Sequence, residues 1–335
     1  MNLPKKHHFL PVFYLSQWAG NDGKIVRFTK PYRDQVVRNR VHPDAAGYLT
    51  KLYAVEGFPE ETVLDLEREF LSPVDSKASE ALRAMLRGEE LFPAERIAWA
   101  GFMSTLLFRM PDDIEKLREN VGEIWDLILP GMAKIYQAVS SQTGGPDFSE
   151  FKEKNGKPMV AARVIEGARR VMADEDIVRG LANLEWSILT VDKAKNDLLT
   201  SDRPVIHTNS LNHPETHLLM PIGPRRLFVG VKDRKLIAKI KSIGEDKLVQ
   251  TTNSHIVGNA KTTVCGRTES QLRFVQNRMG KQIQPSLMDR LKDFQRNLIP
   301  QLLREWELGS SVYAGLLSDA VKSLPLPPRD QGGSR

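Results

Sequence analysis

The hydrophobic pattern of this chain changes its period twice, and this limits the folds that the chain can adopt. Behind a turn at Asn21–Gly23, apolar and polar residues alternate over residues 24–29, as in a half-exposed strand. From about residue 59 to residue 183 apolar residues recur at helical spacing, and short apolar runs between turn residues then return. The pattern predicts an α+β fold with a helical middle region, whose N-terminal strands join a mainly antiparallel sheet in the second half.

Prolines and glycines divide the chain into the individual elements that we expect. Helices are predicted over residues 59–71, 73–88, 93–108, 112–143, 158–183, 245–260, 269–279 and 285–308. Strands are predicted over residues 48–55, 186–191, 198–199, 217–222, 226–232, 235–240 and 262–265. We expect one α+β domain over residues 1–323 with a helical insert at about 59–183, and a disordered tail over residues 324–335.

The first of two conspicuous motifs opens the chain as His8-x-x-Pro11-x-x-Tyr14-Leu15. His8 can donate, accept or titrate near neutral pH, and Tyr14 offers a phenol. The residues between them are too apolar for a free arm. We therefore expect residues 8–15 to be buried against the second half of the chain, and deletion of the first fifteen residues to give insoluble or molten protein.

The second motif is Thr200-Ser201-Asp202-Arg203-Pro204-Val205, at the end of a predicted strand. Three consecutive oxygen-bearing side chains can accept protons, ligate a hard cation or orient a substrate. They can equally close a turn by accepting hydrogen bonds from backbone amides. Asn253, inside a predicted helix, needs a tertiary partner, and we expect the turn at Ser201 and Asp202 to supply it.

Arg109 lies in an apolar stretch at the end of a predicted helix, so it should be at least partly buried. A buried arginine must find a carboxylate, a phosphate or several carbonyl groups. The candidate partners are Glu67, Glu69 and Asp202. The pairing can be structural, or it can belong to a polar site.

The two motifs resemble a bacterial family, the domain of unknown function family forty-two thirty-eight. That family opens with His-Tyr-x-Pro-x-x-Tyr-Leu and carries Thr-Ser-Asp-x-Pro-Val after a strand. In this chain Phe9 replaces the first tyrosine, and Arg203 stands where the family usually has asparagine or another polar residue. The resemblance extends from His8 to about Arg267 and implies no established activity.

Composition excludes some classes of protein and leaves others open. The single cysteine, Cys265, cannot form an intramolecular disulfide, which favours a reducing cytoplasm. No window approaches the roughly 18 apolar residues of a membrane span, so no membrane partner is expected. The net charge of +6 is a mild bias for 335 residues and is compatible with a nucleic-acid or other polyanionic partner. The oligomeric state stays open.

No motif identifies a cofactor or a metal, and the cofactor therefore stays unknown. The chain has no phosphate-binding glycine-rich loop, no Gly-x-Ser-x-Gly elbow and no dinucleotide fingerprint. His207, His213 and His217 are closely spaced, but Pro214 prevents the last two from sharing a helical turn. We therefore predict no metal site there.

Two functions remain compatible with the sequence. In the first, the protein is a hydrolase that acts on a phosphorylated small molecule or nucleic acid, with Asp202 or His8 as the general base. In the second, it is a non-catalytic binding or regulatory module, and the same residues form a buried structural network. The residues concerned are His8, Tyr14, Arg109, Ser201, Asp202 and Asn253.

Exposure distinguishes these two functions, because a site needs an open cavity and a network needs closed, mutually satisfied groups. Burying unpartnered polar groups would cost about 1–3 kcal/mol each. The sequence therefore predicts that the two motifs meet in space, with Arg109 close to a carboxylate. It also predicts that His8→Gln and Asp202→Asn are non-additive in stability.

Overall fold

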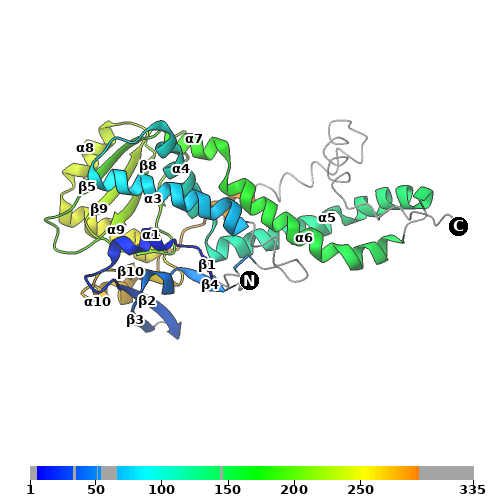
Figure 1. Cartoon of the computed structure of the whole chain (residues 1–335), viewed down its shortest axis with the longest axis horizontal. Coiled ribbons are helices and arrows are strands. Elements are labelled where there is room, and N and C mark those ends of the chain that lie inside the picture. Colours follow the sequence, from blue (N-terminus) through cyan, green and yellow to red (C-terminus); the bar gives the residue numbers. More distant parts are fainter. Residues whose placement is uncertain (1–5, 33–34, 51, 54–65, 144–145, 294–335) are drawn as a thin grey trace.

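The strands gather in one part of the molecule, and two long helices extend from it as an arm (Figure 1). The structure is a computed structural model that describes residues 6–32, 35–50, 52–53, 66–143 and 146–293. Helices dominate the middle of the chain, and every strand pairing in the described residues is antiparallel. The predicted α+β class is confirmed.

The first sheet combines strands from both ends of the chain. Its order is β3 (Gln35–Val41), β2 (Ile25–Tyr32), β10 (Thr263–Gly266) and β6 (Thr200–Ser201). The N-terminal strands thus join the second half, as predicted. Strand β3 was not predicted, and the strand expected at residues 198–199 lies at 200–201.

The second sheet is built entirely from the second half of the chain. Its order is β5 (Glu185–Thr190), β9 (Arg226–Val231), β8 (His217–Gly223) and β7 (Ile206–His207). Three of these strands match their predicted positions to within one residue. Strand β7 is short and pairs only with β8, through Ile206 with Leu219 and His207 with Leu218.

The strand predicted over residues 235–240 is wrong, because this segment forms helix α8 (Lys235–Ser242). Leu236, Ile237 and Ile240 pack together against the apolar cluster beside the second sheet. Their spacing places them on one side of a helix. The segment reads Lys-Leu-Ile-Ala-Lys-Ile, and a short apolar run between lysines also resembles an edge strand. Helices α9 (Glu245–Asn259) and α10 (Leu272–Arg278) follow near their predicted positions.

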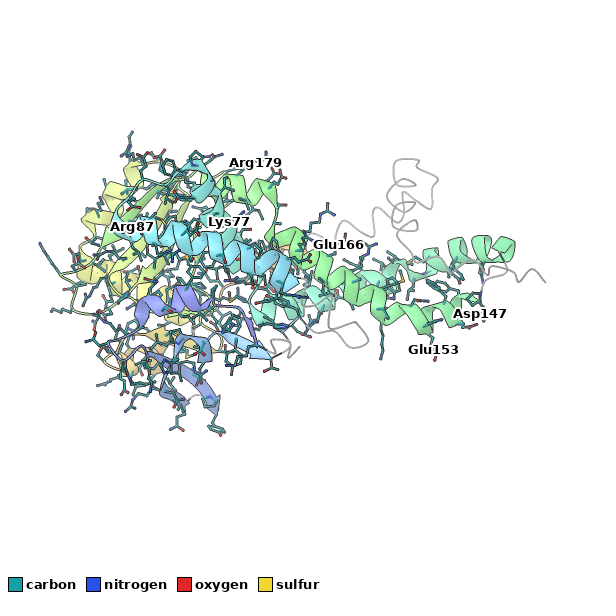
Figure 2. The ribbon with its side chains drawn as sticks, viewed as in Figure 1. Lys77, Arg87, Asp147, Glu153, Glu166 and Arg179 are labelled. Carbon is teal, nitrogen blue, oxygen red and sulfur yellow. The ribbon has the colours of Figure 1, made fainter. Side chains whose placement is uncertain are left out.

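The helical middle begins with a π-helical turn, η3 (Leu66–Leu71), in the described residues. It continues through α3 (Ser72–Arg87), α4 (Pro93–Phe108), α5 (Pro111–Thr143), α6 (Phe148–Met172) and α7 (Glu175–Ala182). Helices α5 and α6 form the arm, with Asp147 and Glu153 at its far end and Glu166 nearer the strands (Figure 2).

Helix α6 starts ten residues before the predicted helix at 158–183 and ends earlier. The side chain of Asp147 caps its first turn by accepting a hydrogen bond from the Glu150 backbone N–H at 2.9 Å. Pro158 therefore lies inside the helix rather than at its start. A strong N-cap overrides the proline as the start signal.

The N-terminal segment is buried, as the sequence predicts. It forms β1 (Lys6–His8), which pairs with β4 (Tyr48–Thr50), then α1 (Val12–Leu15) and the 3-10 turn η1 (Ser16–Trp18). Leu10 and Leu15 are completely buried and Phe9 nearly so. Gly47, with φ near +65°, lets the chain approach so closely that a Cβ there would lie 2.7 Å from the Cβ of Leu10.

Part of the C-terminal prediction lies outside the described residues. The structure shows helix over residues 287–293, the beginning of the helix predicted at 285–308. The remainder of that helix and the tail predicted at 324–335 lie outside the described residues, so the domain boundaries stay a prediction. In the described part of the chain, no helix is both long and apolar enough to cross a membrane.

Candidate functional site

Tyr14 is where the two sequence motifs meet. Its buried hydroxyl lies 2.7 Å from Thr200 Oγ1 and donates to the carbonyl oxygen of Pro221 at 2.7 Å. Since the phenol has one proton, Thr200 must be the donor in the first bond. Trp18 adds a third tie by donating its indole N–H to the Leu198 carbonyl at 2.8 Å. Burial raises the pKa of Tyr14, so the phenol stays neutral.

Asp202 fixes the turn that connects α9 to β10. Its carboxylate accepts from the backbone N–H groups of Lys261, Thr262 and Thr263 at 3.0, 2.6 and 3.1 Å. It also accepts from the Thr262 hydroxyl at 2.8 Å. Burial raises the pKa of Asp202, while these donors favour the ionised form. The carboxylate is 3% exposed and fully engaged within the protein.

Ser201 and Asn253 are also satisfied internally. The Ser201 hydroxyl donates to the Ile256 carbonyl and accepts from the Arg203 backbone N–H, both at 3.1 Å. Asn253 Oδ1 accepts from the Leu199 backbone N–H at 2.8 Å. Its Nδ2 donates to the Asp197 carbonyl and to Gln271 Oε1. Asn253 therefore holds the chain just before Ser201 and Asp202, and its hydrogen bonds go to neither of those residues.

Arg109 is completely buried and holds the N-terminal segment in place. Its Nε donates to the Phe9 carbonyl at 3.0 Å, and its Nη1 donates to Asp75 Oδ1 at 3.0 Å. None of the expected partners, Glu67, Glu69 and Asp202, forms this ion pair. Asp75 was missed because it lies on a charged helix, α3, that the sequence does not connect with Arg109.

His8 lies close to Arg109 and Asp75 but makes a different contact. Its Nε2 is 3.3 Å from the Asp44 carbonyl, and its ring packs on Tyr48 with 5.7 Å between ring centroids. Burial lowers the pKa of His8, with smaller effects from Lys6 and Arg109 that act in the same direction. His8 and Arg109 thus belong to one polar cluster, while Ser201, Asp202 and Asn253 belong to another.

The cluster around Arg109 contains three buried atoms with no hydrogen-bond partner in the described structure. They are Arg109 Nη2, Tyr53 Oη and Glu67 Oε2. Burial raises the pKa of Glu67 to about 7, although the Arg109 cation opposes this. Glu67 therefore titrates near neutral pH inside the protein.

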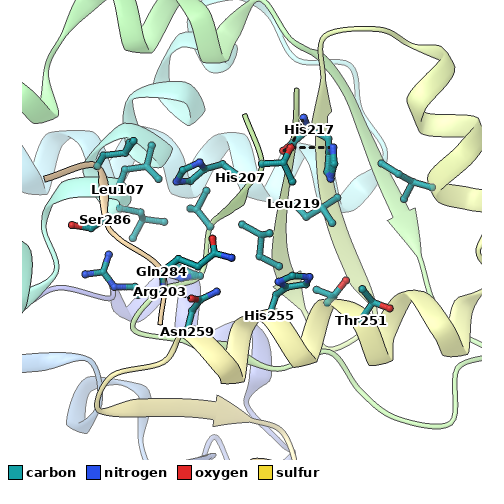
Figure 3. A pocket seen from close by; sticks show the side chains of 18 of the residues that line it. Leu107, Arg203, His207, His217, Leu219, Thr251, His255, Asn259, Gln284 and Ser286 are labelled. Carbon is teal, nitrogen blue, oxygen red and sulfur yellow. Dashed lines mark hydrogen bonds between the residues drawn. The ribbon is translucent and has the colours of Figure 1, made fainter. Parts of the chain in front are cut away.

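A pocket of about 320 Å³ lies between β7, β8 and α9, with the end of α4 and residues 284–287 closing it. The second motif forms one wall, because Arg203, Pro204 and Val205 all line the pocket. Figure 3 shows His207 and His217 on the strand side and His255 on the helix. None of the six residues selected from the sequence lines this pocket.

Arg203 is the charged side chain of the pocket wall. Its Nη2 donates to Asp112 Oδ2 at 2.6 Å and to Asp113 Oδ1 at 3.2 Å. Its side chain is 15% exposed, and its Nε has no partner in the part of the chain that the structure describes. Neither aspartate lines the pocket. The wall therefore presents a cation whose carboxylates lie outside the cavity.

Two further polar groups of the wall matter for chemistry. Burial lowers the pKa of His207, and the cations of Arg290 and Arg203 lower it further, so its imidazole is neutral at neutral pH. Thr252 is 1% exposed, and its hydroxyl has no partner among the described residues. No group of three histidine, cysteine, aspartate or glutamate side chains in the described residues is arranged to hold a metal ion.

The family model described as protein of unknown function (DUF4238) matches residues 6–270. The chain belongs to this family. The match confirms the resemblance seen in the two motifs, and it includes every pocket wall except residues 284–287. No curated protein and no solved structure matches the chain.

Sequence reasoning missed most of the pocket because its walls come from separate elements. Arg203 was the available signal, since it occupies the variable position of the second motif and places a cation there. His255 and Thr252 look like ordinary residues of an amphipathic helix. Only the packing of α9 against the strands brings them to the cavity.

The hydroxyl bond between Tyr14 and Thr200 should appear as energetic coupling. Tyr14→Phe should cost about 1–3 kcal/mol of unfolding free energy, because it leaves the Pro221 carbonyl and the Thr200 hydroxyl unpaired. Thr200→Val should be non-additive with it by more than about 0.5 kcal/mol in urea denaturation. Thr252→Val is the matched control and should cost little, since that buried hydroxyl has no bond to lose. Additive effects of Tyr14→Phe and Thr200→Val would contradict the contact.

Glu67 should make stability fall as pH rises towards neutrality. Its folded pKa of about 7 lies above its ordinary value of 4.5, so the folded state binds the proton more tightly than the unfolded state. The stabilisation is present below about pH 4.5 and is lost as pH rises through about 7. Glu67→Gln should therefore match the wild type near pH 5 and exceed its unfolding free energy at pH 8. Glu69→Gln, an exposed neighbour, should show no such crossover, and equal pH profiles for both variants would count against the assignment.

Proposed function

We propose that this protein binds a small phosphorylated molecule in the pocket between β7, β8 and α9. The observation that carries the proposal is Arg203, a cation in a pocket wall that contains no carboxylate among its described lining residues. Arginine suits phosphate because its planar fork matches two phosphate oxygens. Asp112 and Asp113 hold this fork in position by accepting hydrogen bonds from Nη2.

The pocket favours a small molecule over nucleic acid. A cavity of about 320 Å³ is at the lower end of the range in which small ligands bind, roughly 300–1,000 Å³. A polymer needs a continuous basic track along its backbone. Residues 235–240 were predicted as a strand, but they form α8, so the lysines of this segment do not lie along a sheet edge.

The six residues selected from the sequence support the fold in this proposal. Ser201, Asp202 and Asn253 use their polar atoms to fix the backbone on both sides of the second motif. Tyr14 and Arg109 fix the N-terminal segment. This arrangement favours the interpretation of these residues as a buried network, and it moves the binding role to Arg203 and its neighbours.

Hydrolysis of the bound phosphate ester is a second candidate function, and His207 supports it. A neutral imidazole in the pocket wall can accept a proton from water as the water oxygen attacks phosphorus. The ester bond to the leaving oxygen then breaks, and the imidazolium returns a proton to that oxygen, which gives an alcohol and phosphate. In this proposal His207 replaces Asp202 and His8 as the general base, because those two groups are engaged elsewhere.

Binding of inorganic pyrophosphate to the full-length protein tests the first proposal. Wild type should give a measurable heat of binding in isothermal titration calorimetry. Arg203→Lys keeps the charge but loses the fork, so affinity should fall about tenfold. Arg226→Lys, whose partner Asp192 lies outside the pocket, is the control and should bind like wild type. No binding by a folded wild type, or equal binding by Arg203→Lys, would overturn the proposal.

Release of phosphate from p-nitrophenyl phosphate tests hydrolysis. His207→Gln should lower turnover by about 100-fold, the typical loss when a general base is removed. Wild-type turnover should be constant between pH 7 and pH 8 and should decline below pH 6.5, as the imidazole becomes protonated. His213→Gln, in the adjoining loop and outside the pocket wall, should keep full activity. If the protein binds pyrophosphate but shows no turnover, hydrolysis is excluded and only the binding function stands.

A further inference from the structure

We infer that the ligand is a phosphate monoester of an aliphatic alcohol, with its phosphate at Arg203 and its chain directed towards Leu248. This inference rests on the proposed binding function and adds the chemical class of the ligand. It follows from the distribution of polar and aliphatic side chains along the pocket.

Helix α9 gives the pocket a long axis. Leu248, Thr251, Thr252, His255 and Asn259 line the cavity, and their spacing of three and four residues places them on one face of the helix. From Leu248 to Asn259 the helix spans about 16 Å at a rise of about 1.5 Å per residue. The pocket is therefore longer than a phosphate group alone requires.

The polar groups gather at the C-terminal end of α9. Asn259 Oδ1 accepts from the Gln284 backbone N–H at 3.0 Å, which joins residues 284–287 to this end. Arg203 and Lys261, two residues beyond Asn259, share Asp112 at 2.6 and 2.7 Å. Figure 3 shows Arg203, Asn259 and Gln284 together, with Thr251 at the opposite side of the view. This is the end that suits a phosphate.

The opposite end carries the aliphatic side chains of the pocket, next to the polar side chains of Thr251 and His217. Leu219 and Ile240 pack against the apolar cluster that contains Leu248, and all three line the pocket. Ile243, 46% exposed and also part of the lining, lies just before the start of α9. No phenylalanine, tyrosine or tryptophan is among the described lining residues. A nucleobase would find only the imidazole rings of His207, His217 and His255 to stack on, whereas a hydrocarbon chain would bury its surface against leucine and isoleucine.

Thr252 adds a polar group part-way along this axis. Thr252 lines the cavity, and its buried hydroxyl has no partner within the described residues, although a helical threonine commonly bonds to the carbonyl one turn earlier. The pocket wall thus contains an unpaired donor between the cationic end and the aliphatic end. A ligand oxygen near the ester linkage would satisfy it.

Calorimetric titration with a series of phosphates tests the inference on the full-length protein. The probes are inorganic phosphate, methyl phosphate, butyl phosphate and hexyl phosphate, with 1-hexanol and adenosine monophosphate for comparison. Affinity should rise by up to about fourfold per methylene, which corresponds to about 0.8 kcal/mol for each buried CH₂. Hexyl phosphate should bind more tightly than both adenosine monophosphate and 1-hexanol.

The possible outcomes separate the two proposals. If all phosphates bind with the same affinity, or adenosine monophosphate binds most tightly, the inference of an alkyl chain is overturned and the proposed phosphate site stands. If no phosphate binds, or 1-hexanol binds as tightly as hexyl phosphate, the proposed binding function is overturned, and the inference of an alkyl chain is overturned as well.

Two matched isoleucine variants test where the alkyl chain of the ligand lies. Ile243→Ser should weaken binding of a longer probe, decyl phosphate, several-fold and leave methyl phosphate unchanged, because only a chain that spans about 16 Å reaches that end. Ile97→Ser is the control, since Ile97 is equally exposed at 47% and does not line the pocket. Both substitutions are at exposed positions, so both variants should fold. If affinity depends on alkyl-chain length equally in both variants, the alkyl chain does not lie against Ile243.

Discussion

The hydroxyl of Tyr14 is the contact on which the arrangement of the two sheets depends. Thr200 belongs to β6 of the first sheet, and Pro221 belongs to β8 of the second. By bonding to both at 2.7 Å, one buried phenol from the N-terminal motif fixes the position of each sheet relative to the other. Trp18 strengthens the same tie through the Leu198 carbonyl, just before β6. In a dry interior an unmade bond is costly, so these partners hold a single arrangement.

Beyond β6, Ser201 and Asp202 determine where the chain goes next. Ser201 accepts from the Arg203 N–H, and Asp202 is held by three consecutive backbone amides after α9. The Asp202 backbone N–H also donates to the Thr263 carbonyl. Because both the side chain and the main chain of Asp202 are fixed, Arg203 leaves the first sheet in one direction. That direction leads into the pocket wall.

Sequence patterns predicted the parts of this structure that depend on local periodicity. The strands at residues 185–190, 217–223 and 226–231 are recognisable as short apolar runs between turn residues, and α9 is recognisable because Leu248, Val249, Ile256 and Val257 recur at helical spacing. The segment of α8 was misread because its run of three apolar residues between lysines, Leu236 to Ala238, fits a short strand as well as a helix. The start of α6 was misread because Pro158 was given more weight than the cap at Asp147.

The candidate site was harder to predict because its contacts are not local. That the two motifs meet followed from the cost of burying polar groups, and Tyr14 and Thr200 confirm it. The partner of Arg109 did not follow, because Asp75 has the same surroundings in sequence as any exposed helix carboxylate. The pocket did not follow either, because residues from α4, β7, β8, α9 and 284–287 become neighbours only when the elements pack.

The position of the motif explains why its most polar residues face away from the pocket that it borders. A ligand group binds well only when the protein donors that meet it are already fixed, because ordering them on binding costs affinity. Arg203 has a long side chain that loses considerable rotamer freedom when it is held. Its backbone is held by Ser201, and its fork is held by Asp112 and Asp113. The buried network and the pocket are therefore consecutive parts of one segment, in which Thr200 to Asp202 supply rigidity and Arg203 to His207 supply the surface that would meet the proposed ligand.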